Sequence, residues 1–215
     1  KDLFKTTFDN IKIQSKDSFV NNNFDFKISL GSLIKHFYLE KYERHDFLIN
    51  LNQSEISKWK SKLVSSKPNV GLVWTGSFFG PNQPFRSIQL KNINKILKLD
   101  INYYCLQSEV WESDKEYFDK KRIFDFGKYN LAEIVSIIKN LDLVITVDTA
   151  ILHISSILNK ETWGIFNIYP DWRWGALDSI NPYKSLTKIN QTKFNQWEDV
   201  TEKIYQKLKD KFQLF

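Results

Sequence analysis

The stretch that decides the predicted fold is Leu141–Val147, which reads LDLVITV. Most of its residues are apolar or β-branched, which is typical of a strand covered by helices on both faces. A helical pattern precedes it at Asn130–Asn140, where Asn130 and Glu133 have the spacing of a capping box. Another helical pattern follows at Thr149–Leu158. A buried strand between two helices, with short connections, indicates a βαβ unit.

Strands and helices alternate in the same way over most of the chain. Further strands are expected at Val70–Thr75, Ile101–Leu106, Ile123–Phe126 and Thr162–Phe166, and further helices at Ser54–Val64, Ile88–Leu99 and Gln196–Phe212. The helix at Ile88–Leu99 follows from the apolar residues at positions 90, 93, 96 and 97. The predicted fold class is therefore α/β, a doubly wound parallel sheet with helices on both faces and Leu141–Val147 at its centre. The expected domain boundary lies at Lys67-Pro68, between residues 1–67 and 68–215.

Composition excludes several classes of protein. The 215 residues are 42% hydrophobic and 26% charged, as in a globular chain. The single cysteine, Cys105, rules out a disulfide framework, and its place within an expected strand predicts that it is buried. Three scattered histidines form no metal-binding pattern, and no apolar run approaches the roughly 20 residues of a membrane span. Because the chain begins with Lys1 and has no methionine, residue 1 is expected to be a processed end or a cut.

The net charge of +6 favours anionic partners in a general way. The lysines that produce it are spread along the chain and accompany a preference for asparagine and isoleucine, which points to a codon bias. We therefore interpret the charge as a solvated surface, and nucleic-acid binding as the least supported of the functions considered.

Polar and small residues follow several expected strands, and in a parallel sheet these strand ends share one edge. Asp148, Thr149 and Ala150 come where a strand passes directly into a helix. The first turn of a helix has unpaired N–H groups and a partial positive charge, so a phosphate can bind there with the Thr149 hydroxyl as a further partner. His153 lies four residues after Thr149, on the same helix face. The alternative interpretation is an aspartate N-cap and a hydrogen-bonded core histidine.

Another strand end contributes the small residues Thr75, Gly76 and Ser77. Small residues let backbone N–H groups approach an anion, and Arg86 can hold a phosphate through two parallel hydrogen bonds. The alternative is an ordinary loop between a strand and a helix. Neither the P-loop pattern nor the GxGxxG dinucleotide pattern is present. Gln107, at the next strand end, is suited to bond a base edge or a ribose.

An aromatic and charged segment spans residues 169–175, which read YPDWRWG. Two tryptophans, an arginine and an aspartate cannot all be buried at low cost in one loop. Such a cluster is typical of a wall that stacks on a sugar or a base. The candidates for this wall are Asp171, Trp172, Arg173 and Trp174. The alternative is packing against a neighbouring domain.

Five segments, taken in order, resemble a known family. They are VGLVWTG (70–76), RSIQL (86–90), YYCLQ (103–107), LDLVITVDTAILH (141–153) and PDWRWG (170–175). They are similar to the C-terminal domain of the heptosyltransferase-like glycosyltransferases, the glycosyltransferase family nine type with the GT-B fold, and most of all to the branch often attached to tetratricopeptide repeats. The resemblance covers about residues 47–212, with looser similarity at residues 24–34. Residues 154–159 and Glu161 depart from the family pattern, on the far side of the helix that follows Asp148.

The resemblance implies a metal-independent, inverting transferase that moves a hexosyl or heptosyl group from a nucleotide-sugar donor and needs no cofactor. Carried over by position, Thr75, Gly76, Ser77 and Arg86 would line the diphosphate, and Arg86 would stabilise the leaving group. Asp148, Thr149 and Ala150 would supply the helix N-terminus under the donor, with His153 below it and Gln107 near the nucleoside. The family's general base, an acidic residue of the first domain, has no match in this chain.

The resemblance also implies an incomplete chain, because the GT-B fold has two domains and only about 67 residues precede the second. Residues 1–67 would be the end of the first domain plus a linker, and 68–215 the nucleotide-sugar-binding domain. The expected partners are the nucleotide sugar, an acceptor glycan, lipid-linked saccharide or protein, and either the missing domain or a second copy. The implied location is the cytoplasm, including the inner face of the membrane. The alternative function is a non-catalytic nucleotide- or sugar-binding module or scaffold of the same fold.

Overall fold

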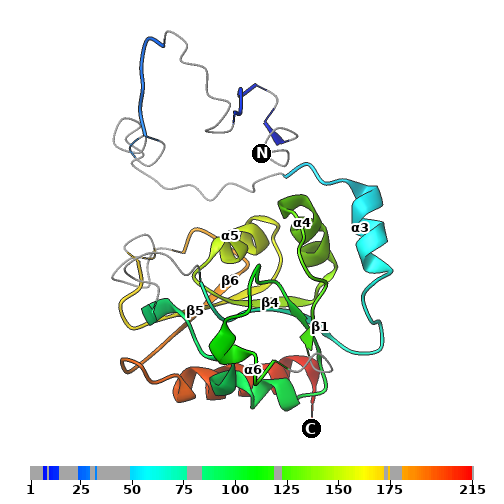
Figure 1. The fold of residues 1–215 in the computed structure, drawn as a ribbon, viewed down its shortest axis with the longest axis vertical. Helices are drawn as coiled ribbons and strands as arrows, with labels where there is room; N and C mark the ends of the chain where they lie inside the picture. The colour runs from blue at the N-terminus through cyan, green and yellow to red at the C-terminus, as the bar shows by residue number, and fades with distance from the viewer. Residues whose placement is uncertain are drawn as a thin grey trace. The chain divides into compact units, whose positions relative to one another are not determined.

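Figure 1 shows the computed structural model of the chain. It describes residues 7–8, 10–14, 24–29, 32, 49–76, 84–118, 123–171, 174 and 181–214. The chain divides into two compact units, Lys1–Asn50 and Leu51–Phe215. No described residue of the first unit lies in a strand. The second unit contains every helix and strand discussed below.

The second unit is built from six strands, four α-helices and a set of short 3-10 helices in its described part. The strands are β1 (Asn69–Val73), β2 (Asn102–Cys105), β3 (Ile123–Phe124), β4 (Leu143–Val147), β5 (Thr162–Phe166) and β6 (Leu186–Asn190). The α-helices are α3 (Gln53–Lys60), α4 (Leu131–Asn140), α5 (Ala150–Ile157) and α6 (Glu198–Phe212). The 3-10 helices are η3 (Pro84–Arg86), η4 (Leu90–Ile93), η5 (Ile96–Lys98) and η6 (Glu112–Asp114).

The six strands form one parallel sheet in the order β3-β2-β1-β4-β5-β6. This is the strand order of a Rossmann-type doubly wound sheet, in which the direction of winding reverses between β1 and β4. All five residues of β4 are buried, and the strand pairs with β1 on one side and β5 on the other. The central position predicted for Leu141–Val147 is confirmed.

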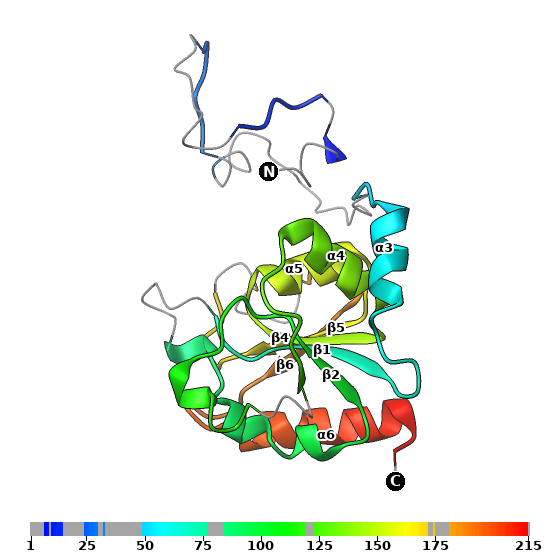
Figure 2. The ribbon, with the colours of Figure 1, turned by 45° about the vertical axis from the view of Figure 1, so that its right-hand side comes forward.

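Helices cover both faces of the sheet, as expected for this fold class. Helices α4 and α5 lie on one face and α6 lies on the other, which is visible in both views (Figures 1 and 2). Helix α6 buries Val200, Ile204 and Leu208. The side chain of Asn140 at the end of α4 donates to the Ile56 carbonyl at 2.9 Å, so α3 packs beside α4. The compact unit thus takes in α3, which precedes the boundary expected at residue 67.

The start of α4 follows directly from local sequence. The Asn130 side chain accepts hydrogen bonds from the Ala132 and Glu133 N–H groups, and the Glu133 carboxylate accepts from the Asn130 N–H. This is the predicted capping box, which satisfies donors that the first helical turn leaves unpaired. It holds the first turn of α4 at the carboxyl edge of the sheet.

Two elements differ from the sequence analysis. Residues 88–99 form the 3-10 helices η4 and η5 and not one α-helix. The apolar residues at 90, 93 and 96 are spaced by three, which aligns them on one side of a 3-10 helix, and all three are buried. Strand β6 was not predicted, because only Leu186 and Ile189 of its five residues are buried and the apolar signal is weak.

Cys105 is buried in β2 and unpaired, as predicted. Burial raises the pKa of its thiol to about 12. The thiolate is the reactive form, so native protein at pH 8 should react with a maleimide far more slowly than a free cysteine. The measurement is the labelling rate with and without denaturant. Equal rates in the two conditions would contradict the buried position.

Candidate functional site

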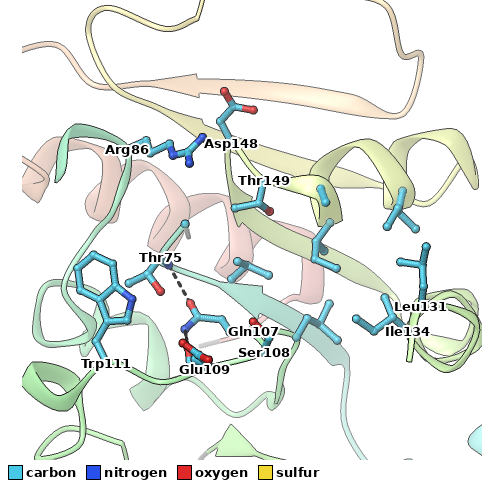
Figure 3. Close-up of a pocket in the computed structure, with 16 residues that line it drawn as sticks. Thr75, Arg86, Gln107, Ser108, Glu109, Trp111, Leu131, Ile134, Asp148 and Thr149 are labelled. Carbon is cyan, nitrogen blue, oxygen red and sulfur yellow. Dashed lines mark hydrogen bonds between the residues drawn. The ribbon is translucent and has the colours of Figure 1, made fainter. Parts of the chain in front are cut away.

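A cavity of about 520 Å³ lies beyond the carboxyl ends of β1, β2 and β4 (Figure 3). In doubly wound sheets ligands bind at this edge, where the winding reverses. The residues predicted from strand ends that line this cavity are Thr75, Gly76, Arg86, Gln107, Asp148, Thr149 and Ala150. Positions that span 75 residues of sequence are thus brought together because parallel strands end at one edge.

The cavity has a polar end and an apolar end. Arg86 and Asp148 lie at one end in Figure 3, and Leu131 and Ile134 lie at the other. Leu131 and Ile134 come from the first turn of α4, whereas the Trp111 ring lies on the side of Thr75 in Figure 3. A ligand with an anionic group and a flat apolar group would match this arrangement.

Arg86 approaches the backbone of Gly76 closely. A Cβ placed on Gly76 would lie 2.9 Å from Arg86 Nε and 3.4 Å from its Cζ, so the guanidinium occupies the space that any larger residue would need. Arg86 Nε is buried and has no hydrogen-bond partner among the described residues. A buried donor without a partner is costly unless a ligand supplies an acceptor.

The start of α5 offers a second group for an anion. Thr149 is the N-cap, but its side chain makes no capping hydrogen bond, and its hydroxyl lies 3.1 Å from that of Thr146. The N–H groups of the first turn are therefore not capped by the Thr149 side chain. Together with the helix dipole they favour a negatively charged ligand group.

Gln107 has a different role from the one predicted. Its Oε1 accepts hydrogen bonds from the N–H groups of Trp74 and Thr75, at 2.7 and 2.8 Å, and its Nε2 donates to the Glu109 carbonyl at 2.9 Å. The amide that was expected to read a base or ribose is engaged in holding the end of β1 against the end of β2. Gln107 lines the cavity, and its hydrogen bonds fix the positions of the two strand ends beside it.

Asp114 supports the same strand end, and sequence reasoning missed it. Its carboxylate accepts from Trp74 Nε1 at 2.9 Å and from the Leu90 N–H at 2.8 Å, and its side chain is only 1% exposed. It therefore links η6 to β1 and η4. The sequence ESDKE around it contains several acidic residues, and nothing local distinguishes Asp114 from its neighbours.

Two predicted site residues lie elsewhere. His153 does not line the cavity: its Nδ1 is 2.8 Å from the Tyr183 hydroxyl, and its ring stacks on Trp174 with centroids 5.2 Å apart. Trp174 is 1% exposed and packs in a core cluster with Leu152 and Phe166, so it cannot serve as an exposed wall. The prediction that Trp174 forms a sugar wall is wrong, and His153 fits the alternative of a hydrogen-bonded histidine in the interior.

The remaining predicted residues are divided between a second cavity and the undescribed part of the chain. Asp171 lines a cavity of about 210 Å³ that shares Arg86 and Asp148 with the first. Ser77, Trp172 and Arg173 lie outside the described residues.

The apolar lining of the first cavity was also missed. It includes Leu131 and Ile134 from α4 and Ile151 and Ile154 from α5. The expectation that residues 154–159 lie on the far side of this helix is therefore wrong for Ile154. The capping box provided a signal for the first pair, because a helix that starts after a parallel strand begins at the binding edge.

Gly76→Ala tests the contact with Arg86. The new methyl group should displace the guanidinium, which is the movable end of a long side chain, so the stability of the fold should change by less than about 0.5 kcal/mol. Affinity for a nucleoside diphosphate should fall several-fold. Thermal melting and titration calorimetry measure the two quantities, and unchanged affinity would show that the position of Arg86 does not matter.

The later part of the chain matches a known protein family. Residues 115–209 match the sequence profile of Glycosyltransferase family 9 (heptosyltransferase). This match covers β3 to most of α6 and therefore includes the start of α5. No curated protein sequence matches the chain.

Solved structures similar to this chain show the same fold. ADP-heptose LPS heptosyltransferase II of E. coli matches with a TM-score of 0.54 and 12% identity, over 78% of this chain and 54% of that one. A glycosyl transferase family 9 protein of Veillonella parvula DSM 2008 matches with a TM-score of 0.54 and 11% identity, over 85% of this chain and 57% of that one. The chain thus spans little more than half the length of either protein. The predicted Rossmann-like α/β fold of the heptosyltransferase type is confirmed.

Two further observations concern metals and membranes. The described residues contain no group of three or more His, Cys, Asp or Glu side chains suited to hold a metal ion. None of the helices in the described segments combines the length and apolarity needed to span a bilayer.

Proposed function

We propose that this chain binds the nucleotide-sugar donor of a glycosyltransferase that transfers a hexosyl or heptosyl group. The observation that carries the proposal is the pairing of Arg86 with the start of α5 across one cavity at the reversal point of the sheet. The profile match of residues 115–209 to a heptosyltransferase family supports it.

The nucleotide part of the donor would occupy the first cavity along its length. Its diphosphate would lie at the polar end, where the buried Arg86 Nε has no acceptor among the described residues and the first turn of α5 presents N–H groups. Its nucleoside would lie against Leu131 and Ile134 at the other end. Arginine suits this position because its planar guanidinium can form two hydrogen bonds with a phosphate.

The proposed reaction is a single displacement with inversion. An acceptor hydroxyl attacks the anomeric carbon, the bond from that carbon to the diphosphate oxygen breaks, and the diphosphate leaves with the electron pair. Arg86 and the α5 dipole would stabilise the charge that develops on the leaving oxygen, which is the contribution that a metal ion makes in other transferases. The hydroxyl proton passes to a general base, which we assign to no residue of this chain.

The acceptor would be a glycan, a lipid-linked saccharide or a protein, approached from a second domain or a second copy of the chain. Because nucleotide sugars are cytosolic metabolites in this family, we propose a cytoplasmic site of action. Attachment to tetratricopeptide repeats also belongs to the proposal.

A thermal-shift screen of ADP, GDP, UDP and their glucose or mannose conjugates tests the binding step. A ligand at 100 times its dissociation constant should stabilise the chain by about 2.7 kcal/mol. Failure of all these compounds to raise the melting temperature at millimolar concentration would overturn the proposal. Transfer or donor hydrolysis by the full-length protein separates an enzyme from a binding module, since a module would bind the donor and leave it intact.

A further inference from the structure

The second cavity, of about 210 Å³, continues from the polar end of the first. It shares Arg86 and Asp148 with the first cavity and extends past the end of β5, along the segment from Asn167 to Asp171. Because Arg86 and Asp148 line both cavities, a ligand bound at Arg86 in the first cavity lies next to the second.

Exposed aromatic rings surround this second cavity. Phe85, Tyr169 and Phe194 line it and are 40%, 77% and 50% exposed, and the rings of Phe85 and Phe194 lie 5.4 Å apart. Among the described residues of the second unit, the other exposed large hydrophobic side chains are Val64 and Tyr117. Aromatic rings gathered around a small polar cavity are suited to pack on the C–H face of a sugar ring.

The polar groups of the cavity are mainly hydrogen-bond acceptors. Asp148 and Asp171 contribute carboxylates, and Asn167 contributes an amide. Asn167 Oδ1 is buried and has no hydrogen-bond partner within the described part of the chain. Arg86 is the sole cation among the described residues that line the cavity. A hydroxyl group can donate a hydrogen bond to such acceptors, whereas an ionised carboxylate cannot.

We propose that the second cavity holds the transferred sugar and selects a neutral, hydroxyl-rich sugar over a sugar acid. This inference rests on the proposed function, since it requires the diphosphate of the donor at Arg86. Asn167 Oδ1 acts as a specificity-determining acceptor for a sugar hydroxyl, and Phe85 and Phe194 form the packing surface.

Titration calorimetry on the 215-residue chain tests the selection. The ligands are the diphosphate of ADP, GDP or UDP type that binds best, the same nucleotide carrying glucose or mannose, and the same nucleotide carrying the corresponding uronic acid. The neutral conjugate should bind about 5- to 10-fold more tightly than the diphosphate alone, the gain of one or two hydrogen bonds. The uronic acid conjugate should bind no more tightly than the diphosphate.

Variants separate the sugar cavity from the nucleotide cavity. Asn167→Leu and Phe194→Ala should each remove most of the gain from the neutral sugar and leave diphosphate affinity unchanged. Asn167→Asp keeps an acceptor of the same shape and should retain the gain. Tyr117→Ala removes another exposed aromatic ring, 40% exposed against 50% for Phe194, outside both cavities and should change neither affinity. Because Asn167 Oδ1 has no partner among the residues that the structure describes, Asn167→Leu loses no described hydrogen bond at that atom, and its melting temperature reports on the fold.

Several results would overturn the assignment of the second cavity to the sugar. Equal affinity for the diphosphate and its neutral conjugate, or tighter binding of the uronic acid conjugate, would overturn it and leave the proposed function standing. Loss of diphosphate affinity in Asn167→Leu would also overturn it, because the cavity would then belong to the nucleotide. If no diphosphate binds at all, the proposed function falls and the inference falls with it.

Discussion

Arg86→Ala is expected to weaken binding of a nucleoside diphosphate by about 10- to 150-fold. A hydrogen bond to a charged group contributes about 1.5–3 kcal/mol, and this variant removes the guanidinium at the polar end of the cavity. Arg86 Nε has no partner among the described residues, so the unliganded fold loses no hydrogen bond at that atom. The melting temperature should therefore change little while the affinity measured by titration calorimetry falls.

Two further variants distinguish a direct contact from general attraction by charge. Arg86→Lys should restore only part of the affinity, because an ammonium group cannot form the paired hydrogen bonds of a guanidinium. Lys91→Ala removes one positive charge from an exposed position of η4, outside the cavity, and should leave affinity within about twofold. Equal losses in Arg86→Ala and Lys91→Ala would mean that Arg86 acts only through the net charge.

Asp114→Ala is expected to destabilise the chain by roughly 2–6 kcal/mol. The substitution leaves the Trp74 indole N–H and the Leu90 backbone N–H buried without their acceptor, and each such group costs about 1–3 kcal/mol. Small domains have a total stability of only about 5–15 kcal/mol, so the upper part of this range approaches complete unfolding. Urea denaturation followed by tryptophan fluorescence measures the change.

Asp114→Asn and Glu112→Ala are the matched controls. The asparagine carbonyl can accept one of the two hydrogen bonds, so this variant should lose about half as much stability. Glu112 lies in the same 3-10 helix, but its side chain is 85% exposed and pairs only with the exposed Lys115 in the described structure. Its replacement should cost less than about 1 kcal/mol. Similar losses at positions 112 and 114 would refute the assignment of Asp114 as a buried link.

Asp114 and Arg86 are linked through the end of β1. Asp114 holds Trp74, and Gln107 holds the N–H groups of Trp74 and Thr75, so both fix the strand end that carries Gly76. Gly76 in turn leaves the space that Arg86 occupies. A folded Asp114→Asn protein should therefore bind a diphosphate less tightly, although Asp114 does not line either cavity.

Residues close together in sequence determined much of the fold. The run LDLVITV predicts a strand buried on both faces, and β4 lies at the centre of the sheet. Asn130 and Glu133 predict the start of α4, since a capping box needs only groups three residues apart. The candidate strand ends could also be grouped in advance, because parallel strands joined by helices must end at one edge.

Tertiary structure alone decided which polar groups remain available for a ligand. Gln107 follows a strand as a binding residue would, but its amide is used by N–H groups 32 and 33 residues away, and Asp114 bonds to an indole 40 residues away. Trp174 is in the core, where its ring contacts those of Phe166 and His153, whereas Asn167 Oδ1 has no partner in the described part of the chain. The spacing of residues in the sequence predicts helices, strands and helix caps, because these depend on neighbours within a few residues. Whether a side chain bonds to the protein or remains open to a ligand depends on what the strand order places opposite it.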